Sequence, residues 1–152
     1  MSIAARLTEL GIDLPQPAAA VANYVGYVRT GNLVHISGQL SNDASGGLKG
    51  TVGVDVTPEQ ANAGARLCGI NLLAQLNAAL DGDLDRVVRV VKLGGFVQAG
   101  PDFTAVPAVI NGCSDLMVEV FGDAGRHARA AVGVYKLPLG FAVEVDAIVE
   151  VR

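Results

Sequence analysis

The sequence predicts an α+β fold: a single mixed six-stranded sheet with two long helices on one face and a short helix at the N-terminus. Six stretches are rich in β-branched residues or alternate apolar with polar side chains, which is typical of half-buried strands. Two longer stretches repeat apolar residues every three or four positions, as amphipathic helices do. Both long helices follow a run of three strands, so they can cover the same face of one sheet.

Length and composition indicate one domain that associates with copies of itself. The 152 residues suit a single domain over 1–152, in which 1–20 form an N-terminal helix and connector. Hydrophobic residues make up 51% of the chain and charged residues only 17%, which excludes a disordered chain. This balance also indicates that part of the apolar surface is buried between subunits.

Charge and hydropathy exclude two classes of partner. The formal net charge is −4, and no window combines Lys and Arg with aromatic residues, so we expect no nucleic-acid partner. No apolar run reaches the ~18 residues of a membrane helix, so we expect no membrane partner. The N-terminus lacks the charged-then-apolar layout of a signal peptide, and we expect a cytoplasmic protein.

The cysteines and histidines favour no metal site. Cys68 and Cys113 fall on apolar faces of the two long helical stretches, where a thiol behaves as a small hydrophobe. His35 and His127 lie far apart in the sequence, with no Cys or Glu at ligand spacing. We therefore expect no disulfide, no metal and no other cofactor.

The first forty residues predict a helix, a connector and a hairpin. A helix is expected over 2–10, and 12–20 is an extended connector with two prolines. The β-rich runs 24–30 and 33–40 flank Gly31-Asn32, a strong hairpin signal.

The clearest local signal opens the first long helix. Thr57 can cap this helix, Pro58 suits its first turn, and Gln60 completes a capping box. A short strand is expected around 48–54. The apolar stripe of the helix is rich in alanine, so the helix can lie close to a sheet. The stripe consists of Ala61, Ala65, Cys68, Leu72, Leu76 and Ala79.

The second half of the chain predicts a strand, a helix and two more strands. The run 87–93 is consistent with an inner strand, and the following Gly94-Gly95 indicates a bulge or the close approach of another backbone. The second long helix is expected from about Ala105 to Phe121. Two strands, over 128–135 and from 141 onward, then form a hairpin or strand pair.

Charged side chains on the last two strands are candidate site residues. Glu144 and Asp146 share one face of the final strand, because side chains alternate along a strand. Arg129 stands among small residues, where a guanidinium can bind a carboxylate through two hydrogen bonds. From the strand pattern alone, a solvated surface arginine is the preferred interpretation.

Five short motifs, taken in their order along the chain, favour the anion-binding interpretation. They are Ser37-Gly38-Gln39, Phe96-Val97-Gln98 before Asp102-Phe103, Ala128–Val134, Leu137-Pro138 and Val143–Ile148. Together they resemble the YjgF/RidA (endoribonuclease L-PSP-like) family, of which the chain looks like a divergent member over about Val21–Val151. The resemblance implies a chorismate mutase-like fold and a homotrimer with clefts between subunits.

The resemblance also implies an activity and a site. Family members hydrolyse small 2-imino or 2-aminoacrylate acids to 2-oxo acids and ammonia. Arg129 matches the arginine that binds the substrate carboxylate, and Glu144 matches the glutamate that helps place the attacking water. Gly38 lies in a strand that lines the same cleft. Tyr24 is the best match for the tyrosine of the first strand, with Tyr27 as the alternative.

Two departures from the family pattern predict a more apolar pocket. Ala131 stands where the deaminases commonly have Cys, and Pro107 stands where they have Asn. The run Asn111–Asp115 and the pair Arg126-His127 could supply replacement polar groups, or Asn111 and Ser114 could face solvent and His127 could be a structural or surface histidine.

Three functions are compatible with these observations. An imine or enamine hydrolase acting on a small carboxylate-bearing metabolite ranks first. A non-catalytic trimeric module that holds a metabolite in the same cleft is the alternative. An endoribonuclease or translation inhibitor ranks last, because the acidic net charge suits RNA cleavage poorly.

Overall fold

The computed structural model describes residues 1–17 and 19–152, which form three helices and five strands. In chain order the elements are α1 (Ile3–Glu9), β1 (Tyr27–Thr30), β2 (Leu33–Leu40), α2 (Pro58–Ala79), β3 (Val87–Gln98), α3 (Val106–Phe121), β4 (Ala128–Val134) and β5 (Val143–Val151). Short 3₁₀ turns lie at Leu84–Arg86, Gly122–Gly125 and Pro138–Gly140.

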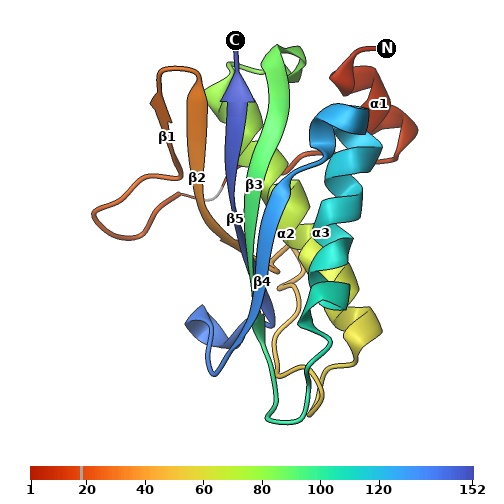
Figure 1. Ribbon diagram of the computed structural model, residues 1–152. Helices are drawn as coiled ribbons and strands as arrows, with labels where there is room; N and C mark the ends of the chain where they lie inside the picture. Colours follow the sequence, from red (N-terminus) through yellow and green to blue (C-terminus); the bar gives the residue numbers. More distant parts are fainter. Residues whose placement is uncertain (18) are drawn as a thin grey trace.

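The strands form one mixed sheet in the order β1-β2-β5-β3-β4. β3 and β4 run parallel, and the other neighbours run antiparallel. α2 and α3 cover one face of this sheet (Figure 1). The expected α+β class with a mixed sheet is therefore confirmed. None of the helices in the described part of the chain is long and apolar enough to span a membrane.

The expectation of six strands is wrong, because the stretch around 48–54 adds no strand to the sheet. It makes only isolated bridges, from Lys49 to Phe141 and from Val52 to Val56 and Ala99. Gly50 and Gly53 have positive φ values of 125° and 86°. A backbone that turns at these glycines cannot run extended beside a neighbour.

The expectation that the last two strands pair with each other is also wrong. β3 lies between β4 and β5 and pairs with both. α3 connects β3 to β4, and a helical crossover of this kind makes the two strands parallel neighbours. The alternation of side chains predicted each strand but could not predict which strand lies beside it.

The glycine pair Gly94-Gly95 lies inside β3 without a bulge, so the expected bulge there is wrong. The register shifts of β3 fall earlier, at Val87/Arg89 and Val90/Lys92. A Cβ atom at Gly94 would collide with the carboxylate of Asp146, and one at Gly95 would lie 2.7 Å from side-chain atoms of Ile110. The two glycines therefore make room for side chains on the two faces of the sheet.

The core lies between the sheet and the two helices α2 and α3. The core-facing residues of β5 are buried, whereas Glu144, Asp146, Ile148 and Glu150 between them are half-buried on the opposite face. The capping box of α2 is confirmed: Thr57 accepts from the backbone of Gln60, whose side chain accepts from the backbone of Thr57. The buried residues of β5 are Val143, Val145, Ala147, Val149 and Val151.

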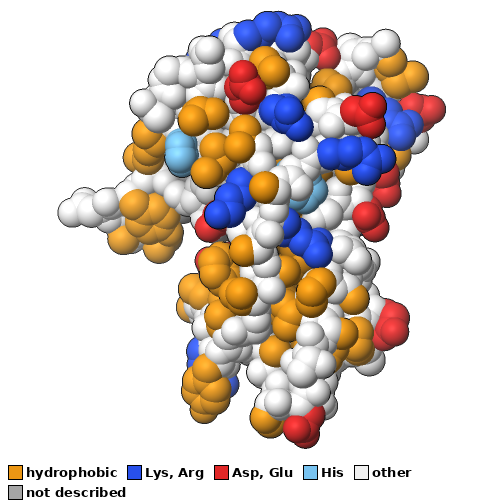
Figure 2. Space-filling view, viewed as in Figure 1, with side chains coloured by type: hydrophobic (Ala, Val, Ile, Leu, Met, Phe, Trp, Pro, Cys, Tyr) orange, Lys and Arg blue, Asp and Glu red, His pale blue; other side chains and the backbone are white. Residues whose placement is uncertain are grey.

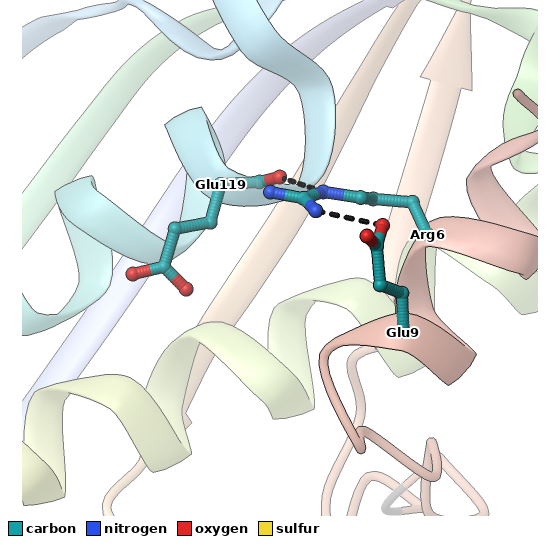
Figure 3. Close-up of polar contacts among 3 residues, drawn as sticks. All are labelled: Arg6, Glu9 and Glu119. Atoms are coloured by element: carbon teal, nitrogen blue, oxygen red, sulfur yellow. Dashed lines mark hydrogen bonds and ion pairs between the residues drawn. The ribbon is translucent and has the colours of Figure 1, made fainter.

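α1 packs against the C-terminal end of α3. Arg6 donates from Nε to the backbone carbonyl of Glu119 at 2.7 Å and from Nη1 to the Glu9 carboxylate at 2.8 Å (Figure 3). The backbone N–H of Ile3 donates to Asp85 at 2.8 Å. These contacts place the N-terminal helix at the rim of the domain, away from the middle of the sheet (Figure 1).

Candidate active site

Arg129 lies on β4, at one edge of the sheet, and its side chain is half-buried. It is in register with Leu93 of β3, whose side chain is in the core, so Arg129 also lies on the helix-covered face. Its Nη1 atom donates to Asn111 Oδ1 at 2.8 Å and to Ser114 Oγ at 3.1 Å, both on α3. The guanidinium is thus held by two side chains without charge.

The positive charge of Arg129 is available to a ligand. None of the ion pairs within residues 1–17 and 19–152 involves Arg129. Both of its hydrogen bonds in the described part of the chain start from Nη1. The N–H groups of Nε and Nη2 form the other side of the guanidinium fork, which matches the two oxygens of a carboxylate.

The polar chain around Arg129 continues to His127. Ser114 Oγ lies 2.8 Å from His127 Nε2, and His127 Nδ1 lies 2.6 Å from the carbonyl oxygen of Gly125. A carbonyl can only accept, so Nδ1 carries the proton of the neutral imidazole and Nε2 accepts from the Ser114 hydroxyl. The sequence left open whether Asn111 and Ser114 face solvent. In the structure both accept hydrogen bonds from Arg129, and His127 is linked to Arg129 through Ser114.

A sequence signal for this cluster exists in the spacing of its members. Asn111 and Ser114 are three residues apart on α3 and therefore share a helix face. His127 immediately precedes β4 and Arg129 is its second residue, so the two are two positions apart on an extended backbone and point the same way. The sequence alone did not show that this face of α3 lies against the side chains of His127 and Arg129.

Glu144 lies on the other face of the sheet, against Gly38. It pairs with Leu40 of β2 and Phe96 of β3. A Cβ atom at Gly38 would lie 2.6 Å from Glu144 Oε2, so the glycine makes room for the carboxylate. Partial burial, and then the negative charge of Asp146, raise the pKa of Glu144.

Tyr24 and Gly38 line one cavity of about 440 Å³ between the N-terminal connector, β2 and α2. Tyr24 is 56% exposed. Tyr27, the alternative tyrosine, packs against the core instead. Of the two, Tyr24 is therefore the one that shares a surface with Gly38.

A single chain does not bring Arg129 and Glu144 together. β3 lies between β4 and β5, so β4 and β5 are two strand spacings apart. Leu93 of β3 is in register with both Arg129 of β4 and Ala147 of β5, and Glu144 is three residues from Ala147 along β5. This offset corresponds to about 14 Å between the Cα atoms. The two side chains also lie on opposite faces of the sheet. One subunit therefore carries two separate halves of the expected site.

The departures from the family pattern lie on the helix side of β4. Ala131 packs against the core near Arg129, and Pro107 lies in the first turn of α3. Burial raises the pKa of the neighbouring Cys113 thiol to about 12, although the charge of Arg129 acts in the opposite direction. Cys113 is therefore a neutral packing residue rather than a reactive thiol.

Within the described residues, no group of three or more His, Cys, Asp or Glu side chains is placed to hold a metal ion. In Figure 2, Lys and Arg side chains are spread over the upper part and the middle of the face around β4, and hydrophobic side chains gather below them.

Comparisons with known proteins identify the family of this chain. A family model described as "YjgF/chorismate mutase-like, putative endoribonuclease" matches residues 4–150. The chain is 53% identical over 152 residues to Protein TCP17 of Trypanosoma cruzi, covering 99% of this chain and 94% of that protein. It is 28% identical over 138 residues to a 2-iminobutanoate/2-iminopropanoate deaminase of Dermatophagoides farinae, covering 91% of each.

A solved structure extends the similarity to three dimensions. The crystal structure of an Agrobacterium tumefaciens protein of unknown function matches with a TM-score of 0.92 at 48% identity, covering 99% of this chain and 92% of that one. The family model, the relatives and the fold lead to the same conclusion. This chain belongs to the YjgF/RidA family.

Proposed function

We propose that this protein hydrolyses small 2-imino carboxylates and their enamine tautomers, releasing ammonia and a 2-oxo acid. The observation that carries the proposal is Arg129, a half-buried guanidinium that neutral acceptors hold through Nη1 while Nε and Nη2 remain for a carboxylate. Similarity to a relative named as a 2-iminobutanoate/2-iminopropanoate deaminase supports the same chemistry.

The proposed reaction adds one water molecule to the imine carbon. Arg129 binds the substrate carboxylate and so fixes the imine carbon in front of the water. The Glu144 carboxylate accepts a proton from the water as the water oxygen bonds to the imine carbon, and passes this proton to the nitrogen, giving a carbinolamine. Glu144 then takes the hydroxyl proton of the adduct and delivers it to the amino group. The C–N bond breaks, ammonia leaves, and the carbonyl of the 2-oxo acid forms. No cofactor is needed, because no oxidation occurs.

The proposed site lies between subunits of a homotrimer, in which Arg129 of one chain meets Tyr24, Gly38 and Glu144 of its neighbour. The separation of these groups within one chain supports this arrangement. The sheet face away from the helices also exposes Val28 and Val132, at 54% and 45%. Association would cover these side chains.

The test is ammonia release from 2-iminobutanoate generated in the assay. Arg129→Ala should lower kcat/KM by at least ~100-fold, because the substrate loses its orienting contact. Arg126→Ala is the matched control: the Arg126 side chain is 70% exposed and pairs only with Asp123 in the described part of the chain. It should keep full activity. If the wild-type protein, Arg129→Ala and Arg126→Ala were equally active, Arg129 would have no role in the reaction.

The alternative functions give different results in the same experiment. A metabolite-binding module would bind 2-oxobutanoate in an Arg129-dependent manner without releasing ammonia from any imine. If the protein were an endoribonuclease, RNA-degrading activity would stay with it through every purification step and would be lost in the Arg129→Ala variant. The net charge of −4 does not favour the second outcome.

A further inference from the structure

We propose that Ser114 and His127 form a nucleophile and base pair, giving the protein an acyl-transfer site for small esters beside Arg129. This activity is separate from imine hydrolysis, since it uses a serine hydroxyl rather than a water molecule held by Glu144. A hydroxyl becomes a nucleophile when an adjacent base can take its proton and a third group orients that base. The described residues provide three parts of such a site: the contact between hydroxyl and base, the group that orients the base, and a positive charge beside them.

The first part is the contact between hydroxyl and base. Ser114 Oγ lies 2.8 Å from His127 Nε2, within the range for proton transfer. Because Nδ1 donates to the carbonyl of Gly125 at 2.6 Å, the lone pair of the neutral ring is on Nε2. The imidazole is thus already in the tautomer that a general base requires.

The second part is the backbone carbonyl of Gly125, which orients His127. Gly125 is buried at the end of a 3₁₀ turn that follows α3. A Cβ atom at this position would collide with the backbone carbonyl of Met117, so the turn lies directly against the helix. The carbonyl that orients His127 is therefore fixed to the same helix that carries Ser114.

The third part is a positive charge at the reacting atoms. Arg129 Nη1 donates to Ser114 Oγ at 3.1 Å. A cation at this distance stabilises the negative charge that develops on Oγ and on the oxygen of a tetrahedral adduct. The guanidinium also favours substrates that carry a carboxylate. Ser114, His127 and Arg129 are all half-buried, so a small reagent can reach them.

The proposed reaction needs only the ester and water. Ser114 Oγ bonds to the ester carbonyl carbon while its proton moves to His127 Nε2. The bond from that carbon to the alcohol oxygen breaks, and the alcohol leaves with the proton. Water then attacks the acyl-serine, and Ser114 regains a proton from His127. The net reaction converts ester and water to acid and alcohol.

The test uses a fluorophosphonate, which forms a P–O bond with an activated serine as fluoride leaves. Intact mass and peptide mapping of the full chain should show one adduct, on Ser114. Ser114→Ala should abolish the adduct, and His127→Gln should slow labelling by about 100-fold, the usual contribution of a general base. Ser45→Ala is the control: Ser45 also donates to a neighbouring side chain, Asp43, and its loss should leave labelling unchanged.

A second measurement keeps the test independent of folding and of imine hydrolysis. The protein should release a burst of 4-nitrophenol from 4-nitrophenyl acetate, with an amplitude near one per chain, and Ser114→Ala should remove the burst while its circular dichroism stays native. An unlabelled wild-type protein, or labelling that persists in Ser114→Ala, would overturn the proposal. Neither result depends on whether the protein releases ammonia.

Discussion

The protonation of Glu144 should set the acid side of the pH profile for imine hydrolysis. Partial burial, and then the charge of Asp146, raise the pKa of Glu144 above its usual value of 4.5. The reaction uses the carboxylate, so kcat/KM should fall as the pH falls through this raised pKa. The decrease of kcat/KM on the acid side of the profile should therefore be centred above pH 4.5. Measuring kcat/KM for ammonia release as a function of pH gives the position of this acid limb.

Two substitutions separate the causes of this pH dependence. Asp146→Asn removes the neighbouring negative charge and should move the limb to lower pH, while Glu144→Gln should lower kcat/KM by about 100-fold and abolish the limb. A limb that stays in place in Glu144→Gln would assign it to another group.

Gly38 is the residue whose replacement should displace Glu144 most directly. In Gly38→Ala, the new methyl group would lie 2.6 Å from Glu144 Oε2, and the flexible carboxylate would have to move. Ammonia release should fall by ~100-fold, since a shift of about 1 Å has that effect on a catalytic group. Stability should change by less than about 1 kcal/mol in chemical denaturation.

The matched control for this substitution is Gly133→Ala on β4. A Cβ atom at Gly133 would meet only ordinary contacts, the nearest at 3.4 Å from Ala99. This variant should keep both activity and stability. Similar activity in the two alanine variants would mean that the position of Glu144 does not matter to the reaction.

At the level of elements, the contact between α2 and α3 determines where Asn111 and Ser114 lie. Gly112 of α3 packs directly on the backbone carbonyl of Asn62 in α2. Gly112→Ala would push the two helices apart and should lower the free energy of unfolding by about 1–3 kcal/mol. Urea denaturation measures this difference.

Asp115→Ala is the comparison on the same helix, because Asp115 is exposed. Its effect should stay within about 0.5 kcal/mol. If Gly112→Ala is as stable as Asp115→Ala, the close approach of the helices does not hold α3 in place, and the acceptors of Arg129 must be positioned by other contacts.

The elements that could be predicted are those with local signals. The capping box at Thr57 and Gln60 marked the start of α2, because cap and helix are neighbours in sequence. The stretch 48–54 misled the prediction, since its valines favour a strand while the φ values of its glycines do not. Pairing between β4 and β3 could not be predicted, because it depends on contacts far apart in the chain.

At the level of the whole molecule, candidate site residues could be proposed from the sequence, but their arrangement could not. The order of the motifs along the chain predicted Arg129, Glu144, Gly38 and Tyr24 as site residues. Strand order then placed Arg129 and Glu144 on different strands and different faces. Two groups separated in this way can act on one substrate only if a second copy of the chain supplies one of them.

Subunit mixing tests this requirement. Arg129→Ala and Glu144→Gln should each keep only about 1% of wild-type ammonia release, or less, when assayed alone. After mixing in equal amounts and reassembly, sites that combine an intact Arg129 with an intact Glu144 should restore about a quarter of wild-type ammonia release, as random pairing across a head-to-tail interface predicts. The control mixes Arg129→Ala with the double variant Arg129→Ala/Glu144→Gln. It contains no intact Arg129, so it should not recover ammonia release. No recovery in the first mixture would place the whole reaction within one subunit.

The proposed reaction begins when Arg129 binds a small carboxylate in a cleft between subunits. The decisive measurement is a crystal structure of the protein with 2-oxobutanoate. The ligand carboxylate should contact Nε and Nη2 of Arg129 while Nη1 keeps Asn111 and Ser114, with Glu144 of a neighbouring subunit facing the 2-oxo carbon. A ligand bound elsewhere, or Arg129 facing solvent with no second chain beside it, would rule out this role of Arg129.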